Sequence, residues 1–548
     1  MRKPILAALL TLNITAAQAA VVSPVFQLVQ DCRALSPFPL SSLVELRPEV
    51  AASELESHLL QLFNFNDKIS YFRSGASAEE RNQLLMCQLH LADEFDALLA
   101  DPAAEALINT LSHSSRPELN QLADVLGELR QSRLPPEVKS RLYTAQAAYR
   151  HGLSQQSMQL EFPGAQCRLN TSTTDQPIDI SIARYLMSQP SSDCRAKVWQ
   201  AYQRRAAQRN QEPLTIISGI NQQLAHNANR ADYAQLTLDS HYLNTPELVM
   251  QFLESQTHNM GVAPWDIGRK LKQLPKASFN TLTPYGILSL LTPALTELGL
   301  TLEQPAPTIY RLWNDGRLLG EIHLASESRS ADYALVKPVI GRQFGTVLLL
   351  MPEKIINARQ LEQALAALAE SIVTLGSGQQ YYLLNHENQS LAIAQSWLSQ
   401  WLNMKLAKQL PQPKDHRWQL MQAYSAQLQV FRGKLALAQA KAGGINTEEA
   451  ADWFSRSFGY QWPNAQDALY GFSALADSGP EYYLPLWNQA LGRLILAQTQ
   501  CCISPKDVYN ALIINPNLQP LKTRLEELLN ISAEPADIIR RLPHENQA

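Results

Sequence analysis

Apolar residues recur with helical spacing over most of this chain, which predicts a mainly helical protein. The expected helical blocks cover residues 50–160, 181–229, 389–409 and 418–442. A further helix should begin at Pro246, with Thr245 as its cap, and run to about Thr257. No unit repeats at a fixed period, so the helices are not expected to form a solenoid.

Residues 308–351 depart from the helical pattern. The run TIYRLWNDGRLLGEIHLA alternates between apolar and polar positions, and the triplet Asn-Asp-Gly at 314–316 interrupts it. That triplet is typical of a tight hairpin turn. A second β-rich run at 346–351 directly precedes another helical segment. We therefore predict a small sheet beside that helix.

The helical segment after the sheet, LEQALAALAESIVTL at 361–375, contains no histidine. Its apolar residues form one stripe at helical spacing, namely Leu361, Leu365, Leu368, Ile372 and Leu375. The pattern favours a helix that buries this face.

The first residues have the three parts of a secretory signal. Arg2 and Lys3 supply positive charge, residues 5–14 are mostly apolar, and Ala17-Gln18-Ala19 offers small residues for cleavage. The apolar run is shorter than the roughly 20 residues that a membrane helix needs. We predict a signal peptide at 1–19, cleavage near Ala19, and a periplasmic or secreted protein.

The charge balance and the cysteines narrow the function classes. A formal net charge of −4 provides no basic footprint for nucleic acid, and no later segment is apolar enough to span a membrane.

Six cysteines in an oxidising compartment favour disulfides. Sequence proximity favours Cys167–Cys194 first and Cys32–Cys87 second. For the adjacent Cys501 and Cys502, two buried or separately paired thiols are favoured over a vicinal bridge or a copper site.

Several segments carry a family resemblance through their shared order. They are CRAKVWQAY at 194–202, DYAQLTL at 232–238, PWD at 264–266, NDG at 314–316 with GEIHL at 320–324, and GPEYYLPLW at 479–487. In this order they resemble motifs of the thimet oligopeptidase, neurolysin and oligopeptidase A family of zinc metallopeptidases. The resemblance spans about residues 102–487.

The resemblance implies a two-lobed, almost all-helical fold around a deep channel for short peptides. A small sheet would line that channel beside the zinc-binding helix. The implied organisation is an N-terminal helical region at 20–180, a metallopeptidase-like domain at 181–535 and a C-terminal tail at 536–548.

This sequence departs from the family wherever the family uses an ionic catalytic group. Ala367 and Ser371 stand where the two zinc-binding histidines belong, and Leu368 stands where the glutamate base belongs. Ser396 or its neighbours occupy the place of the third zinc ligand, and Gly471 that of a further histidine. Hydrolysis through a zinc-bound water needs those groups. We therefore expect no zinc and no catalysis.

The preferred hypothesis is an inactive family homologue that binds peptides or extended protein segments in the channel between the lobes. Capture would use strand addition along residues 317–325, involving Gly320, Ile322 and His323. Tyr482 and Tyr483 would donate hydrogen bonds to the peptide.

Two other hypotheses stay open. The first is a zinc oligopeptidase with rearranged ligands, drawn from His386-Glu387 with His323 or Glu370. The second is a periplasmic scaffold or assembly partner that uses the outer surface.

Overall fold

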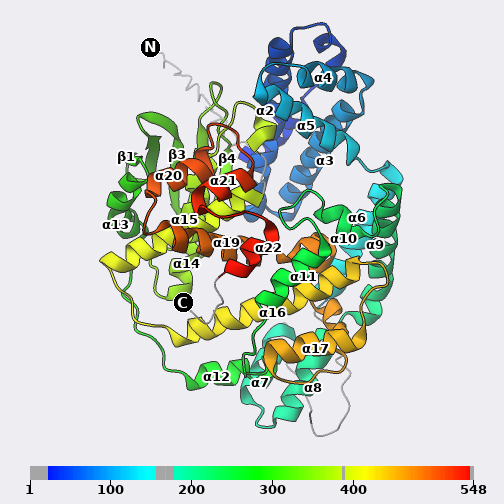
Figure 1. Ribbon diagram of the computed structural model, residues 1–548, viewed down its shortest axis with the longest axis vertical. Coiled ribbons are helices and arrows are strands. Elements are labelled where there is room, and N and C mark those ends of the chain that lie inside the picture. Colours follow the sequence, from blue (N-terminus) through cyan, green and yellow to red (C-terminus); the bar gives the residue numbers. More distant parts are fainter. Residues whose placement is uncertain (1–22, 156–166, 168–177, 386–388, 543–548) are drawn as a thin grey trace, which may run out of the picture. The chain divides into compact units, whose positions relative to one another are not determined.

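The computed structural model describes residues 23–155, 167, 178–385 and 389–542. The protein is mainly helical, with one small mixed sheet (Figure 1). It divides into two compact units, Met1–Leu107 and Ile108–Ala548. The boundary expected near residue 180 therefore falls inside the second unit, and the arrangement of two lobes around a channel stays a prediction. No helix in the described ranges combines the length and apolarity that crossing a membrane requires.

The first unit is a helical bundle held by a disulfide. It consists of α1 (Pro24–Arg33), the short η1 (Leu40–Leu43), α2 (Pro48–Gly75), α3 (Ala78–Ala100) and the start of α4 (Pro102–Ser112). The Cys32–Cys87 bond joins α1 to α3, with both cysteines fully buried, which confirms that predicted pair. Ser77 and Glu80 form a capping box at the start of α3, so this helix begins where its local sequence dictates.

The second unit contains the remaining helices and the five strands of the described residues. Its helices up to the sheet are α5 (Pro117–Gln131), α6 (Pro136–Ser154), α7 (Ile178–Ser188), α8 (Ser192–Gln203), α9 (Ala207–Asn227), α10 (Tyr233–Leu238), α11 (Pro246–Ser255), η2 (Pro264–Asp266), α12 (Ile267–Gln273) and α13 (Pro284–Glu297). After the sheet come α14 (Ala358–Gly376), η3 (Tyr382–Asn385), α15 (Gln389–Gln409), α16 (His416–Ala440), α17 (Thr447–Phe458), η4 (Ala465–Gly471), α18 (Ala474–Ser478), η5 (Gly479–Tyr483), α19 (Leu484–Thr499), α20 (Pro505–Tyr509), η6 (Asn510–Ile514), α21 (Leu521–Leu529) and α22 (Pro535–Arg541).

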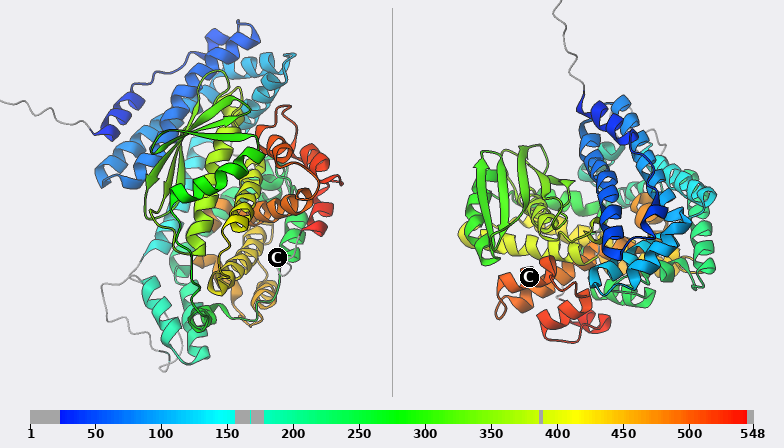
Figure 2. Two further views of the ribbon diagram at one scale, coloured as in Figure 1. Left: turned by 90° about the vertical axis from the view of Figure 1, so that its left-hand side faces the viewer. Right: turned by 90° about the horizontal axis from the view of Figure 1, so that it is seen from above.

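The sheet has the strand order β1-β2-β3-β5-β4. Its strands are β1 (Leu300–Ala306), β2 (Ile309–Asn314), β3 (Arg317–Ser326), β4 (Ala331–Val336) and β5 (Gly345–Met351). The β3–β5 pair is parallel and the other pairs are antiparallel. Along β5, Val347, Leu349 and Met351 are fully buried, and α14 packs on β3, β4 and β5 (Figure 2).

The hairpin predicted at residues 314–316 is confirmed. Asp315 and Gly316 both have positive φ, 47° and 83°, between β2 and β3. Positive φ at both central positions gives the tight turn that matches the twist of the flanking strands. The predicted run at 346–351 is confirmed as β5, and the helix that follows it as α14.

The predicted helix from Pro246 is confirmed as α11, and Thr245 caps it by accepting a hydrogen bond from the Leu248 amide at 3.2 Å. The block at 389–409 coincides with α15. At the C-terminus the predicted tail is wrong in part, because α22 continues to Arg541. The signal peptide at 1–19 and residues 543–548 lie outside the described residues.

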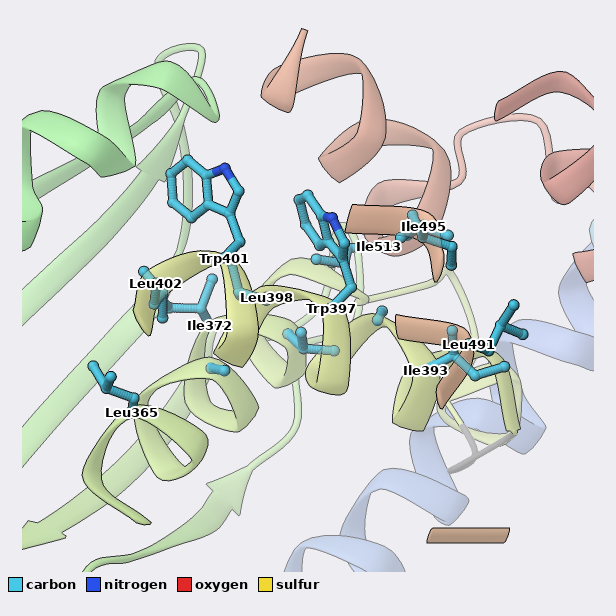
Figure 3. Close-up of a cluster of buried hydrophobic side chains, with 14 of the residues drawn as sticks. Leu365, Ile372, Ile393, Trp397, Leu398, Trp401, Leu402, Leu491, Ile495 and Ile513 are labelled. Atoms are coloured by element: carbon cyan, nitrogen blue, oxygen red, sulfur yellow. The ribbon is translucent and has the colours of Figure 1, made fainter. Parts of the chain in front are cut away.

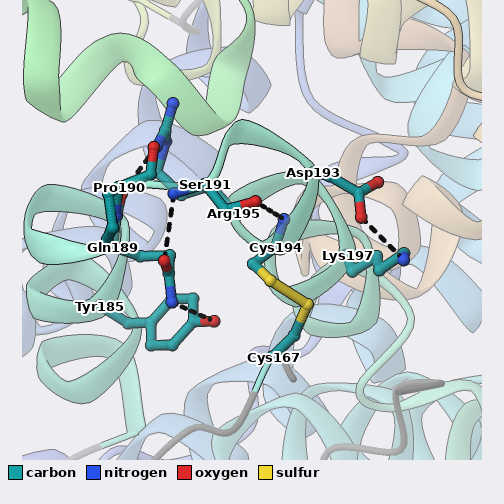
Figure 4. Close-up of a disulfide and its surroundings, with 9 residues drawn as sticks. All are labelled: Cys167, Tyr185, Gln189, Pro190, Ser191, Asp193, Cys194, Arg195 and Lys197. Carbon is teal, nitrogen blue, oxygen red and sulfur yellow. Dashed lines mark hydrogen bonds and ion pairs between the residues drawn. A yellow bond between two sulfur atoms is a disulfide. The ribbon is translucent and has the colours of Figure 1, made fainter. Parts of the chain in front are cut away.

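The second predicted disulfide, Cys167–Cys194, is also confirmed (Figure 4). Cys194 lies in the first turn of α8, where its amide donates to the cap residue Ser191 at 3.3 Å. The prediction for the third pair is wrong. Cys501 and Cys502 are bonded to each other, and both are exposed in the turn after α19. With the other four cysteines paired, each of these two has the other as its nearest partner.

Candidate functional site

Helix α14, the histidine-free helix, is capped and packed as a core element. Asn357 caps its start by accepting a hydrogen bond from the Gln360 amide at 2.9 Å. Its residues Leu365 and Ile372 belong to the same buried apolar cluster as Leu398 and Leu402 of α15 (Figure 3). The predicted apolar stripe therefore faces a continuous hydrophobic core, as its helical spacing indicates.

The three positions of α14 that the resemblance assigns to catalysis are buried in that core. Ala367 is 5% exposed, and Leu368 and Ser371 are 0% exposed. The Ser371 hydroxyl donates to the Ala367 carbonyl at 2.9 Å, so its hydrogen-bonding capacity is used within the helix. A buried polar group without a partner would destabilise the fold, and this arrangement avoids that cost.

The sheet approaches α14 closely through two glycines. An added β-carbon would lie 2.7 Å from the Leu375 side chain at Gly320 and 2.5 Å from it at Gly345. Gly320 is therefore a packing residue beneath α14, and Ile322, which is 1% exposed, faces the core as well. Their expected role in peptide contact is wrong, because neither is accessible.

The expected strand addition along 317–325 is also wrong. Strand β3 lies between β2 and β5 and pairs with both. A strand in the middle of a sheet has already used its main-chain groups on both sides, so a peptide cannot add to it.

His323 has a different position from its neighbours on β3, because it lies on the half-exposed side. Its Nε2 is 3.4 Å from Glu321 Oε2, and Glu321 also accepts from Arg311 at 3.0 Å. The hydrogen bond from Arg311 is the main reason why the pKa of Glu321 is lowered. His323 is therefore part of a surface ion-pair group.

Ser396 and Gly471 contact different parts of the fold. The Ser396 hydroxyl lies against α19, where a β-carbon added to Gly492 would approach it to 2.9 Å. At Gly471 an added β-carbon would meet the Gln203 side chain at 2.8 Å. A histidine at position 471 would require Gln203 to move.

The paired tyrosines differ sharply from each other. Tyr483 is 1% exposed and packs on Phe252 at a ring distance of 6.3 Å, and its hydroxyl has no hydrogen-bond partner among the residues that the structure describes. Burial raises the pKa of Tyr483 well above its usual value. Its expected role as a donor to peptide is wrong, because the buried hydroxyl is out of reach of a ligand. Tyr482 packs on Phe472 at a ring distance of 5.1 Å. It is only half-buried, so part of its side chain is accessible.

Among the described residues, no three His, Cys, Asp or Glu side chains gather closely enough to hold a metal. His323 lies on the outer side of the sheet, and Glu370 is exposed on α14. His386 and Glu387, the other proposed ligands, lie outside the described residues.

A second group of side chains, which sequence reasoning missed, surrounds Tyr482. We call Tyr202, Arg205, Arg432, Phe472 and Tyr482 the aromatic–arginine cluster. The Arg432 guanidinium lies 4.8 Å from the Phe472 ring centre, and the Arg205 guanidinium lies 4.1 Å from that of Tyr202. These contacts are in the range of cation–π interactions. Arg205, Arg432, Tyr202 and Tyr482 are all half-buried.

Of the two tyrosines in the cluster, Tyr202 has a strongly raised pKa. Burial, followed by its hydrogen bond to Asp179, raises the pKa of Tyr202 to about 12, while Arg205 acts in the opposite direction. Tyr202 therefore stays neutral near physiological pH and donates its proton to the Asp179 carboxylate. The charge of this group resides on the two arginines.

A buried lysine lies two residues after Arg432 on α16. Lys434 is 0% exposed, and its Nζ is 3.0 Å from Glu254 and 2.7 Å from the Thr257 hydroxyl. Burial lowers the pKa of Lys434 to about 8 despite the attraction of Glu254. Glu254 and Arg456 line an adjacent polar cavity of about 490 Å³. The carboxylate of Glu254 is shared between Lys434 and Arg456, so this group is internally paired.

No protein-family model matches the chain, and no curated protein does. Among solved structures, the chain is similar to one titled "Structure of Pyrococcus furiosus Carboxypeptidase Apo-Mg", with a TM-score of 0.47 and 11% sequence identity. The match covers 92% of this chain and 98% of that chain. Likeness at this level assigns neither a family nor an activity to this protein.

Proposed function

We propose that this protein is exported and binds peptides or extended protein segments without hydrolysing them. The observation that carries the proposal is the burial of Ala367, Leu368 and Ser371 in the core. A hydrolytic metal site needs ionisable ligands around an open position, and α14 presents two apolar side chains and a serine bonded to its own helix there instead.

The binding contacts would come from the aromatic–arginine cluster in place of β3. Tyr482 offers a partly exposed side chain with a hydroxyl, and Arg205 and Arg432 offer donors that have no ion-pair partner among the described residues. Accessible aromatic and arginine side chains are the types enriched where proteins bind other chains.

Export is supported by the disulfides. Cys32–Cys87 and Cys167–Cys194 would persist in an oxidising compartment and would be reduced in most cytosols. Mass spectrometry of the protein from its native host would test export directly. We expect the mature N-terminus to follow Ala19, and an intact Met1 would contradict export.

The binding test uses the purified mature chain and a library of fluorescein-labelled random hexapeptides, read by anisotropy. We expect saturable binding that is unchanged by a metal chelator. Tyr482→Ala should weaken it, while Tyr285→Ala removes a more exposed tyrosine, on α13, and serves as the control. Absence of binding to the whole library would end the proposal.

The rival zinc-peptidase hypothesis is tested on the same sample. We expect no bound zinc by elemental analysis and no cleavage of internally quenched hexapeptides. One tightly held zinc per chain, with cleavage that a chelator stops, would replace the present proposal with a rearranged active site.

A further inference from the structure

Two cations of the aromatic–arginine cluster converge on consecutive residues. Arg205 donates to the Gly471 carbonyl at 3.4 Å and to the Tyr202 carbonyl at 3.0 Å. Arg432, from α16, stacks on the ring of Phe472, the next residue after Gly471. Segments that are far apart in the sequence therefore place two guanidinium groups around one short stretch of chain.

Neither cation has an acidic partner within ion-pair distance among the residues that the structure describes. The nearby acids are engaged elsewhere: Asp467 with Arg204 at 3.9 Å, and Asp179 with the Tyr202 hydroxyl. The Nε of Arg432 is buried without a hydrogen-bond partner among the described residues, so a ligand would reach only the outer nitrogens of this half-buried side chain. A guanidinium without an acidic partner forms charge-assisted hydrogen bonds with an anion that reaches those nitrogens.

The local charge indicates what kind of anion fits. Arg205, Arg432 and Asp179 all act on the Tyr202 hydroxyl, so two positive charges and one negative charge leave a single positive charge there. A carboxylate carries one negative charge and has the planar geometry that guanidinium groups bind through two parallel hydrogen bonds. A phosphate would bring up to two negative charges near Asp179 and would fit less well.

We infer that Arg205 and Arg432 bind the C-terminal carboxylate of a peptide, with the rings of Phe472 and Tyr482 beside its last residues. This inference rests on the proposed function, because it names which peptides the protein takes. The half-buried state of both arginines leaves their outer N–H groups within reach of a ligand. Peptides with a free C-terminus should therefore bind better than the same peptides as C-terminal amides.

The test compares two fluorescein-labelled hexapeptide libraries that lack Asp and Glu, one with a free C-terminus and one amidated. We expect the free acids to bind about 10- to 100-fold more tightly, which corresponds to hydrogen bonds that involve a charged group. Arg432→Gln should remove that difference by weakening the binding of the free acids towards that of the amides. An unchanged far-UV circular dichroism spectrum would show that the variant is folded. Arg209→Gln, an exposed arginine of α9, is the matched control and should behave as the unaltered protein does.

Three results would overturn the inference. Equal binding of acids and amides would reject the carboxylate site and leave the proposed peptide binding intact. Binding of acetate as tight as that of the acid library would assign the site to small carboxylates rather than to peptide termini. Binding of neither library would reject both the inference and the proposed function.

Discussion

The histidine-free helix α14 and the aromatic–arginine cluster differ in whether their polar groups have partners. On α14, Leu368 and Ser371 are fully buried, and the one hydroxyl is satisfied within the helix. In the cluster, Arg432 has a buried N–H without an acceptor and a charge without a counter-ion among the described residues. The buried hydroxyl of α14 is therefore satisfied, while the cluster contains polar groups that are not.

This difference indicates that α14 contributes to the stability of the fold and that the cluster contributes to binding. A sealed apolar helix contributes to folding through buried area and close packing. An unpaired cation lowers stability unless a ligand supplies its partner, so its presence points to binding. Substitutions in the two regions should therefore affect different measurements.

The largest effect should come from Leu368→Ala. Removing a fully buried leucine from the core of α14 leaves a cavity, and we expect a loss of about 2–5 kcal/mol in the free energy of unfolding. Urea denaturation followed by circular dichroism measures it. Leu85→Ala on α3, where the leucine is 44% exposed, is the control and should change stability by no more than about 0.5 kcal/mol. Equal effects at both sites would contradict the burial of α14.

A second effect should appear as a pH dependence from Lys434. The folded protein releases this proton near pH 8, whereas the unfolded chain holds it up to the ordinary lysine pKa of 10.5. The unfolded state therefore binds more protons in that window, so stability should rise with pH between about 8 and 10.5. The shift corresponds to at most about 3 kcal/mol.

Lys434→Met isolates this contribution. Denaturation curves from pH 7 to 10.5 should show that the variant lacks the rise seen in the unaltered protein, relative to its own value at pH 7. The same rise in both proteins would assign it to another group. The pair of Lys434 and Arg432 sharpens the comparison, since Lys434 has an acidic partner in Glu254 and Arg432 has none among the described residues.

A smaller effect is expected from Ser371→His, which restores a family residue on α14. The larger ring must enter a fully packed site, and overpacking of this kind costs about 1–3 kcal/mol. Ser371→Ala should be nearly neutral, because it removes only a hydroxyl bonded to its own helix. Differential scanning calorimetry compares the two, and a stable histidine variant would show that α14 has room for a ligand.

The smallest change in stability should come from Arg432→Gln. It loses a stacking contact on Phe472, worth about 0.5–1 kcal/mol, and also removes an uncompensated charge. Thermal unfolding should therefore shift little, while the preference for free C-termini disappears. A large loss of stability would identify Arg432 as a structural residue.

Local signals account for the elements that could be predicted. The Asn-Asp-Gly triplet has the residues that a tight turn needs, and Thr245 with Pro246 forms a helix start. Strands β1 and β4 were missed as separate elements, because β1 contains Pro305 and is mostly exposed, and β4 has no alternation. Both lie at the edges of the sheet, where a strand need not bury a face.

Strand order and side-chain convergence could not be predicted in the same way. Nothing local to residues 317–325 indicates that β5 pairs with β3 on one side while β2 pairs on the other. The bond between Cys501 and Cys502 likewise depended on how the other four cysteines pair.

By itself, the sequence determined that α14 carries no histidine, no carboxylate at the expected positions and an apolar stripe, because composition and helical spacing are properties of one continuous segment. Only the tertiary structure decided that β3 is enclosed, that Tyr483 is buried while Tyr482 is accessible, and that Arg205 and Arg432 meet at Gly471 and Phe472. The physical reason is that burial and electrostatic pairing depend on contacts between segments separated by hundreds of residues.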